Sequence, residues 1–363
     1  MREGEGGNWM KRIMVVGSGG SPAANFIRAL RDAPENFWTI GTEVSQYEIF
    51  RSEADETYIT PFASHPKSIE VLQGLIDKTS AEFIHAQPDV EIFNISKNRN
   101  KLDAITFLPK HKTVEICMNK ISSYECWKNA GLQVPETMLI RNEDNLKRSM
   151  ETFGPKIWLR EISGAFGKGS LPTDSLDLAK SWIDYREGWG NYSAAECLTP
   201  QTVTWSSIWK DGELVVAQGR NRLYWELGNR SPSGVTGITG TGVTVSDSEV
   251  DNTAQHAIFA IDKNPNGIFS VDMTYDMDNI PNPTEINIGR FFTTIYFFTK
   301  AGLNMPYIFV KLAYDEKIPT IKKRINPLTP GLCWIRGVDF LPILTNLKEI
   351  KRYEEEMKRW ENE

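Results

Sequence analysis

PNPTEINIGRFF, residues 281–292, is a β-prone run that carries a carboxylate, a carboxamide and a guanidinium. Side chains two apart on a strand point to the same side, so Glu285 and Asn287 share one face. The isoleucines that alternate with them pack on the opposite face, and the run ends in a glycine and Arg290. The strand is therefore built to present two oxygen donors.

The run GIFSVDM at 267–273 supplies a third oxygen donor, Asp272. The turn-rich segment DMDNIPNP follows it and predicts a hairpin that brings Asp272 beside Glu285. Mg²⁺ prefers oxygen ligands and usually takes one or two protein carboxylates. Asp272, Glu285 and Asn287 fit that preference, and Mn²⁺ is an alternative ion. The other interpretation is a polar strand face with ordinary cross-strand hydrogen bonds.

The amino-acid composition of the chain limits the kinds of partner that it can bind. The chain has 363 residues, 40% of them hydrophobic, enough for a substantial core and two or three domains. A formal net charge of −6 leaves no broad basic surface, so we expect no nucleic-acid partner. No run of about 18 apolar residues is present, so we expect no membrane span. The four cysteines form no CxxC pair and the first residues lack a leader pattern, which predicts a cytoplasmic protein without structural zinc.

The element pattern changes along the chain. Alternating strands and helices predict a doubly wound parallel domain over residues 10–112, beginning with the strand RIMVVG at 12–17. After it the pattern is mostly antiparallel, with a subdomain over 113–192, another over 193–345 and a charged helix over 346–363. The fold class is therefore α/β and α+β. The last helix either docks on its own body or serves dimerisation.

A glycine-rich turn links two expected strands in WLREISGAFGKGS, residues 158–170. Glycines free the backbone to turn its N–H groups toward an anion, and neighbouring basic and hydroxyl groups add donors. The sequence GxxxxGK[ST] is absent, so this is no Walker A loop. A phosphate-covering loop and a simple hairpin turn are the two interpretations. The residues concerned are Arg160, Gly164, Gly167, Lys168, Gly169 and Ser170.

The order of these segments resembles the ATP-grasp superfamily, and most of all the ATP-binding half of the carbamoyl-phosphate synthase large subunit. The matching segments are MNKISSYECWKNAGLQVPET, KIWLREISGAFGKGS, AAECL, GITGTGVTV and the final VDM with TEINIGR, within residues 12–310. This resemblance implies an ATP-grasp fold with a Rossmann-like pre-ATP-grasp domain at the N-terminus. It also implies ATP and Mg²⁺ as cofactors.

The resemblance implies roles for single residues. Lys120 and Arg160 would contact nucleotide phosphates, and the 164–170 loop would close over them. Arg290 and Arg160 would stabilise charge on the transferred phosphoryl group. The three oxygen donors would hold the metal. Adenine would lie against Glu196, Cys197 and Leu198, and Thr202 stands where many members carry a ribose-binding glutamate.

The implied reaction joins a small-molecule carboxylate to an amine through an acyl phosphate. Arg220 and Arg222 lie two apart on an expected strand, where they either pair with a substrate carboxylate or are solvated. The turn after the first strand, with Gly17, Gly19 and Ser21, would help line the acceptor site. A homodimer is the commonest assembly for a soluble chain.

Three other functions compete with the ligase. A synthase-like enzyme that forms carboxy-phosphate or carbamoyl-phosphate would share the same site. The GSGGSP turn and Glu43 are reminiscent of a dinucleotide fingerprint, although Pro22 stands where the third glycine is required, which makes an NAD-dependent oxidoreductase the weaker rival. A nucleotide sensor without turnover is the non-enzymatic alternative.

Overall fold

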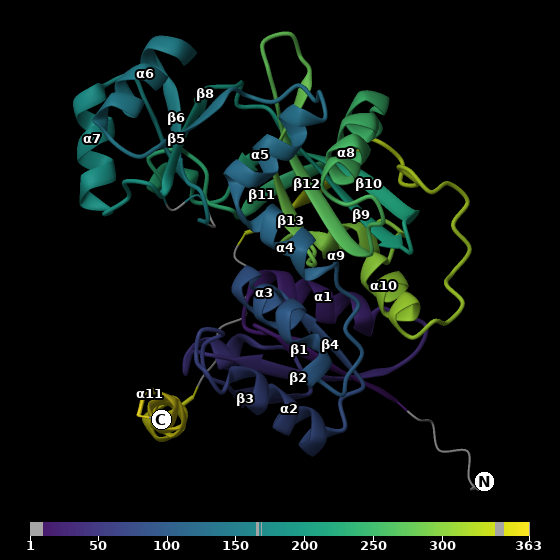
Figure 1. Cartoon of the computed structure of the whole chain (residues 1–363). Helices are drawn as coiled ribbons and strands as arrows, with labels where there is room; N and C mark the ends of the chain where they lie inside the picture. The colour runs from purple at the N-terminus through teal and green to yellow at the C-terminus, as the bar shows by residue number, and fades with distance from the viewer. Residues whose placement is uncertain (1–9, 165–166, 168, 338–344, 363) are drawn as a thin grey trace, which may run out of the picture. The chain divides into compact units, whose positions relative to one another are not determined.

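The computed structural model describes residues 10–164, 167, 169–337 and 345–362, which divide into two compact units (Figure 1). The first unit contains residues 10–108, 294–319 and 345–362, and the second contains residues 109–293 and 320–337. Residues 294–319, which we expected within the segment 193–345, thus belong to the first unit. The other expected boundaries stay predictions.

The first unit is built on a parallel sheet with strand order β3-β2-β1-β4, which confirms the predicted doubly wound domain. Its first strand reads IMVV over its buried stretch, as expected for a strand covered on both faces. The strands are β1 (Lys11–Val16), β2 (Phe37–Glu43), β3 (Glu56–Ile59) and β4 (Phe83–Ala86). The helices are α1 (Ser21–Arg31), α2 (Ser68–Thr79) and α3 (Asp89–Asn98), with 3₁₀ turns η1 (Glu48–Arg51) and η2 (Arg99–Lys101).

Two further helices return to this unit late in the chain, α9 (Ile295–Lys300) and α10 (Met305–Ala313). The α10 sequence MPYIFVKLA is almost continuously apolar, and a helix that is hydrophobic all round must be buried. The ring of Phe309 lies 5.7 Å from that of Phe83 and 5.1 Å from that of Phe107, measured between centroids. This aromatic cluster explains why residues 294–319 leave the second unit.

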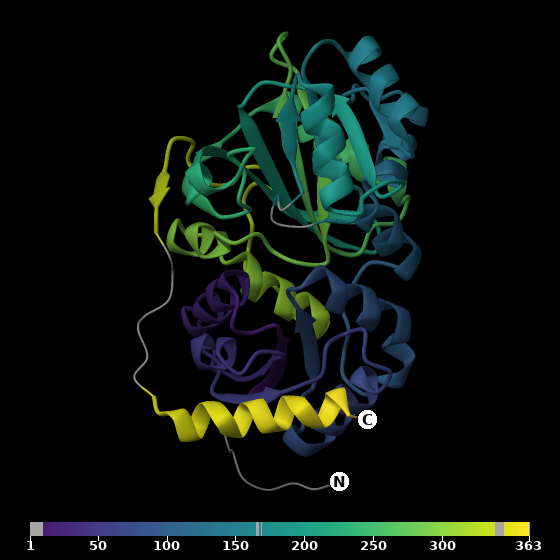
Figure 2. The ribbon, with the colours of Figure 1, turned by 90° about the vertical axis from the view of Figure 1, so that its left-hand side faces the viewer.

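The C-terminal helix α11 (Leu347–Glu361) docks on the first unit (Figure 2). Its Tyr353 ring lies 5.4 Å from that of Phe50, and its Trp360 ring lies 5.9 Å from that of His65. The apolar residues of this charged helix therefore contact its own chain, which is the first of the two arrangements that the sequence allowed.

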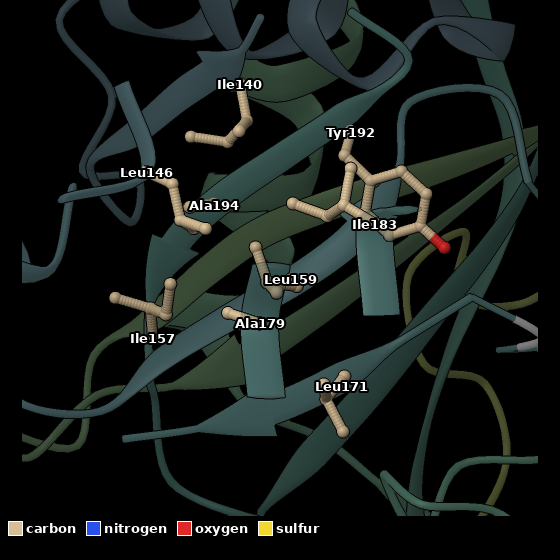
Figure 3. Packing of buried hydrophobic residues seen from close by; sticks show 9 residues of the cluster. All are labelled: Ile140, Leu146, Ile157, Leu159, Leu171, Ala179, Ile183, Tyr192 and Ala194. Atoms are coloured by element: carbon tan, nitrogen blue, oxygen red, sulfur yellow. The ribbon is translucent and has the colours of Figure 1, made fainter. Parts of the chain in front are cut away.

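The second unit contains a small antiparallel sheet with order β5-β8-β6-β7. Two helices, α6 and α7, pack on one face of it, and side chains from strands and helices form a closed core between them (Figure 3). The elements are β5 (Thr137–Ile140), α6 (Glu143–Phe153), β6 (Ile157–Glu161), β7 (Leu171–Thr173), α7 (Leu176–Tyr185) and β8 (Tyr192–Glu196).

The large sheet of this unit has the order β13-β12-β9-β10-β11-β14 and is antiparallel throughout. The β9–β10 hairpin turns at Asp211 and Gly212, whose φ angles are 49° and 84°, as an Asp-Gly pair predicts. The strands are β9 (Thr202–Lys210), β10 (Glu213–Trp225), β11 (Thr239–Val245), β12 (Gly267–Tyr275), β13 (Pro281–Ile288) and β14 (Cys333–Ile335). The remaining elements are α4 (His111–Met118), α5 (Lys120–Asn129), α8 (Ser248–Ile261) and η3 (Gly228–Arg230).

The two faces of the large sheet differ in polarity. Helices α4, α5 and α8 contact its first strands, and Trp205 of β9 donates its Nε1–H to Asp251 of α8 at 2.8 Å. The opposite face of the central strands carries hydroxyl, carboxylate and guanidinium groups, because polar residues occupy alternate positions there. No helix in the described part of the chain has the length and apolar character of a membrane span.

Candidate nucleotide and metal site

The β12–β13 hairpin places the predicted oxygen donors together. Asp272 stands opposite Glu285 in the register, and Ser270 stands opposite Asn287. The amide Nδ2 of Asn287 donates to Asp272 Oδ2 at 2.9 Å, and its Oδ1 accepts from Arg290 Nη2 at 2.5 Å. Asp272, Asn287 and Arg290 are thus linked by hydrogen bonds, and Glu285 stands beside Asp272.

Cations surround the two carboxylates. Lys120 Nζ lies 3.7 Å from Glu285 Oε1, and Arg222 Nη2 lies 3.7 Å from Asp272 Oδ1. Arg160 donates from Nη1 to the carbonyl of Thr284 at 3.2 Å. Burial lowers the pKa of Arg160, and the neighbouring Glu285 carboxylate opposes that shift. Positive groups therefore approach the carboxylates from several elements of the second unit.

The donor set fits Mg²⁺ better than a softer ion. It offers two carboxylates and a carboxamide oxygen, and Mg²⁺ leaves the rest of its shell to water and phosphate. No cluster of three or more His, Cys, Asp or Glu side chains with metal-binding geometry occurs in the described ranges. Asp272, Glu285 and Asn287 would be the residues that hold the ion.

Lys120 occupies the first turn of α5, where a cap fixes its position. Asn119 precedes the helix, and its Oδ1 accepts from the backbone N–H groups of Ile121 and Ser122, both at 3.1 Å. Lys120 Nζ donates to the carbonyl of Gly164 at 2.8 Å. The lysine is only 8% exposed, so it reaches the carboxylate of Glu285 and the glycine-rich loop from a buried position.

The glycine-rich loop follows β6. A β-carbon on Gly167, whose φ is +67°, would lie 2.6 Å from the carbonyl oxygen of Val235. Gly164 and Gly169 instead pack closely on the side chain of Glu161. Lys168, which we expected to contact phosphate, lies outside the described residues. Gly167 is thus required both for its backbone conformation and for close packing, whereas Gly164 and Gly169 allow a close approach to Glu161.

A cavity of about 650 Å³ lies between the small and large sheets of this unit. That volume falls in the range of about 300–1,000 Å³ that is typical of ligand pockets. Twelve of the predicted residues line it: Lys120, Arg160, Gly164, Gly167, Gly169, Ser170, Glu196, Cys197, Leu198, Arg222, Asp272 and Glu285. Asn287, Arg290 and Arg220 do not line it, and the first two adjoin it through Asp272.

The predicted adenine hinge follows β8 at the end of the small sheet. The Glu196 carboxylate accepts from the backbone N–H of Glu136 at 2.9 Å, so its Oε2 is held by the neighbouring strand end. Burial raises the pKa of the Cys197 thiol, and Lys156 opposes that shift. Thr202 lines the cavity and accepts from Arg222 Nη1 at 2.8 Å.

Arg220 and Arg222 share the polar face of the large sheet, as their spacing predicts. Arg220 donates to Thr239 Oγ1 at 3.0 Å and to Thr204 Oγ1 at 2.8 Å, and its guanidinium carbon lies 4.6 Å from the Phe292 ring centroid. Burial first, and then the charge of Arg222, lower the pKa of Arg220 to about 9. Arg222 is the one of the two that faces the cavity.

The predicted acceptor turn lies in the first unit, where Gly17 and Gly19 follow β1 and Ser21 begins α1. Glu43, at the end of β2, accepts from the backbone N–H of Gly19 at 3.0 Å and from that of Val44 at 2.8 Å. In a dinucleotide site such a carboxylate would bind ribose and the turn would face pyrophosphate. The internal contact between Glu43 and Gly19 argues against an NAD site.

Sequence reasoning missed Trp158 and Lys156 in the cavity wall, which come from β6 and the residue before it. Trp225, which ends β10, also lines the cavity. The guanidinium carbon of Arg222 lies 3.7 Å from the centroid of the Trp225 ring. The alternation of β6 points Trp158 away from the core residues Ile157 and Leu159, and that signal was present in the sequence.

Comparison with known proteins places this geometry in a fold family. No protein-family model and no curated protein sequence matches the chain. Solved structures do match over most of its length. The biotin carboxylase domain of Hydrogenobacter thermophilus 2-oxoglutarate carboxylase matches with a TM-score of 0.67 at 14% identity, covering 90% of this chain and 74% of that one. The chain has an ATP-grasp fold.

Two other structures show the same likeness. An N5-carboxyaminoimidazole ribonucleotide synthetase in complex with ADP has a TM-score of 0.66 at 10% identity, with 97% of each chain covered. The L-amino acid ligase of Bacillus licheniformis has a TM-score of 0.64 at 11% identity, covering 84% of this chain and 74% of that one. The predicted ATP-grasp fold is confirmed, with its parallel sheet at the N-terminus and antiparallel sheets after it.

Proposed function

We propose that the chain is an ATP- and Mg²⁺-dependent ligase that activates a carboxylate as an acyl phosphate for attack by an amine. The observation that carries this proposal is the facing pair Asp272 and Glu285, which lines a cavity shared with Lys120 and Arg160. Two of the similar solved structures are complexes with adenine nucleotides, one with MgADP and one with ADP.

The Nε atom of Arg160 supports the proposal of a bound anion. Its Nε is buried and has no hydrogen-bond partner among the described residues, and burying a polar group without a partner is unfavourable. A phosphate oxygen would satisfy it. Arg160 and Lys120 would then hold the nucleotide phosphates, while the hinge at Glu196, Cys197 and Leu198 holds the base.

The reaction has two balanced steps. A carboxylate oxygen of the acid forms a bond to the γ-phosphorus as the bond to ADP breaks. The amine nitrogen then forms a bond to the acyl carbon, phosphate leaves and the amine loses a proton. When bound, Mg²⁺ supplies a Lewis acid for the phosphoryl oxygens. Arg160 donates to the carbonyl of Thr284 and Arg290 to Asn287, and both would stabilise the charge that develops.

Arg222 is the group best placed to bind the acid. It lines the cavity, and only Asp272 forms a described ion pair with it. Its Nε and Nη1 donate to the hydroxyls of Thr239 and Thr202, which orients the guanidinium plane. A carboxylate is the geometric match for such a fork. Arg220, which does not line the cavity, would reinforce the positive potential at Arg222. Gly17, Gly19 and Ser21 stay predicted substrate-binding residues.

A second candidate is the formation of carboxy-phosphate from bicarbonate. The similar biotin carboxylase domain was solved as a dimer in complex with MgADP, ADP and bicarbonate. The same carboxylate pair and arginines would serve this smaller acid. We propose a homodimer for this chain on the same comparison, to be measured by light scattering of the full chain.

A screen for ADP release distinguishes the two reactions. The full chain is incubated with ATP and Mg²⁺, and with organic acids, amino acids or bicarbonate, each with and without an amine. The ligase predicts ADP release only when an organic acid and an amine are both present. Release with bicarbonate alone would favour carboxy-phosphate formation, and Mg-independent release would contradict both.

A further inference from the structure

The side chain of Glu161 is the feature of the second unit that the proposed site leaves unexplained. It ends β6 directly after Arg160, and it is 30% exposed. Arg186, just after α7, donates to Glu161 Oε1 from Nε at 2.9 Å and from Nη2 at 2.5 Å. The hydroxyl of Tyr192 lies 3.4 Å from the same oxygen. This carboxylate is therefore held by charge-assisted hydrogen bonds on the small sheet.

Both ends of the glycine-rich loop pack against this carboxylate. A β-carbon on Gly164 would lie 2.7 Å from Glu161 Oε2, and one on Gly169 would lie 2.7 Å from Oε1. Real β-carbons do not approach other atoms that closely, so a larger residue at either position would have to displace the Glu161 side chain. The loop thus leaves β6 and returns to β7 around the side chain of Glu161.

Helix α7 holds the returning end as well. Trp182 donates its Nε1–H to the carbonyl of Gly169 at 3.1 Å, and the guanidinium carbon of Arg186 lies 5.6 Å from the Trp182 ring centroid. Arg186 and Trp182 are four residues apart and so share one side of the last turn. One helix end thereby anchors both the carboxylate and the backbone that returns to β7.

Gly164, where the loop leaves β6, connects this anchor to the proposed metal ligands. The carbonyl of Gly164 accepts from Lys120 Nζ, which also lies 3.7 Å from Glu285. Ser170, at the returning end, lines the same cavity. A shift of Glu161 would move Gly164 and Gly169 together, and with them the groups that face the cavity.

We propose that Glu161 is a positioning residue for nucleotide phosphate binding. It acts with Arg186 to fix the glycine-rich loop at Gly164 and Gly169. This inference rests on the proposed function. Glu161 lines the cavity at its loop end, but its carboxylate is paired with Arg186 and would repel a phosphate. Its effect therefore passes through the backbone of Gly164 and Gly169 rather than through contact with the nucleotide.

The test compares MgATP with adenosine as probes of the full chain. Glu161→Gln keeps the volume of the side chain and removes its charge. We expect about a tenfold higher Kd for MgATP, equivalent to about 1.4 kcal/mol. The Kd for adenosine, which lacks phosphates, should stay within about twofold, since the base hinge is untouched. Arg186→Met should reproduce the pattern, and the double variant should be no worse than either single one.

A matched control lies on α6, which packs beside α7. Glu143 of α6 pairs with Lys180 of α7 at 2.8 Å and with Lys147 at 3.1 Å, so Glu143→Gln removes two ion pairs from the small-sheet region without changing Glu161 or Arg186. It should leave both Kd values unchanged. Equal MgATP affinity in Glu161→Gln and the unsubstituted chain would overturn this inference alone. Failure of the unsubstituted chain to bind MgATP would overturn the proposed function and this inference with it.

Discussion

Lys120 makes two contacts that tie the parts of the candidate site together. Its ammonium group lies 3.7 Å from Glu285 and donates to the carbonyl of Gly164 at 2.8 Å. A buried cation needs a nearby negative group, and Glu285 supplies it when no nucleotide is present. A phosphate would compete for the same ammonium. Lys120 is therefore placed to exchange a protein carboxylate for a ligand anion.

Replacement of Glu285 by alanine tests the metal assignment at the residue scale. Loss of this carboxylate should reduce Mg-dependent ADP release, with the substrates found in the screen, by at least about 100-fold, because metal stabilisation of phosphoryl charge is worth several kcal/mol. Glu213→Ala, at an exposed position on β10, is the control and should keep full activity. Turnover that survives in Glu285→Ala would show that another group holds the ion.

The oxygen donors were predictable because strand alternation and hairpin length are local rules. Asp272 and Glu285 are joined by a turn-rich segment, so their pairing follows from nearby residues alone. Trp225 and Lys156 could not be placed, since which distant loops meet at the cavity is decided by tertiary packing. The role of Glu161 was hidden for the same reason: Arg186 lies 25 positions away, beyond a helix.

Strand β6 divides its side chains between a core and a cavity. Ile157 and Leu159 are fully buried with helices α6 and α7 (Figure 3). Trp158 and Arg160 line the cavity instead. The order of residues along five positions thus sets both the stability of the small sheet and the shape of the proposed nucleotide pocket. This division allows adjacent substitutions to separate stability from binding.

Two alanine variants of β6 should separate the effect on stability from the effect on nucleotide binding. Leu159→Ala should lower the free energy of unfolding by about 3 kcal/mol, as is usual for a buried leucine. Trp158→Ala should raise the Kd for MgATP by about tenfold while costing less stability, because its ring faces the cavity. Urea unfolding and calorimetric titration provide the two measurements. If both variants lost the same free energy of unfolding, the two faces of β6 would contribute equally to the core.

At the scale of the whole molecule, the chain builds two units by returning to the first one twice. Residues 294–319 and 345–362 both belong to the unit of the N-terminal parallel sheet, and residues 320–337, which lie between them in the sequence, belong to the second unit. The return of α10 was missed because the pattern along 193–345 contains no linker, although its apolar sequence required a core to cover it. The parallel sheet itself was predicted from its alternating elements.

Glu91 makes the stability of the first unit depend on pH. Burial, together with the neighbouring Glu43 carboxylate, raises its pKa from 4.5 to about 7. The folded chain therefore holds a proton that the unfolded chain releases above pH 4.5, so this stabilisation is complete below pH 4.5 and is lost as pH rises through 7. Between pH 4.5 and 7 the free energy of unfolding of Glu91→Gln should therefore rise by about 3 kcal/mol relative to that of the unsubstituted chain.

Urea unfolding at several pH values measures that gain, with Glu70→Gln, an exposed position on α2, as the control. A difference between Glu91→Gln and the unsubstituted chain that stays constant from pH 4.5 to 7 would show that Glu91 is ionised throughout in the folded protein.

The measurement closest to the central claim is a calorimetric titration of the full chain with ATP, once in excess Mg²⁺ and once in EDTA. The site built from Asp272, Glu285 and Asn287 predicts binding in Mg²⁺ that is at least about tenfold tighter than in EDTA. Equal affinity under the two conditions, or binding of NADH in preference to ATP, would contradict a metal-bridged nucleotide at these residues.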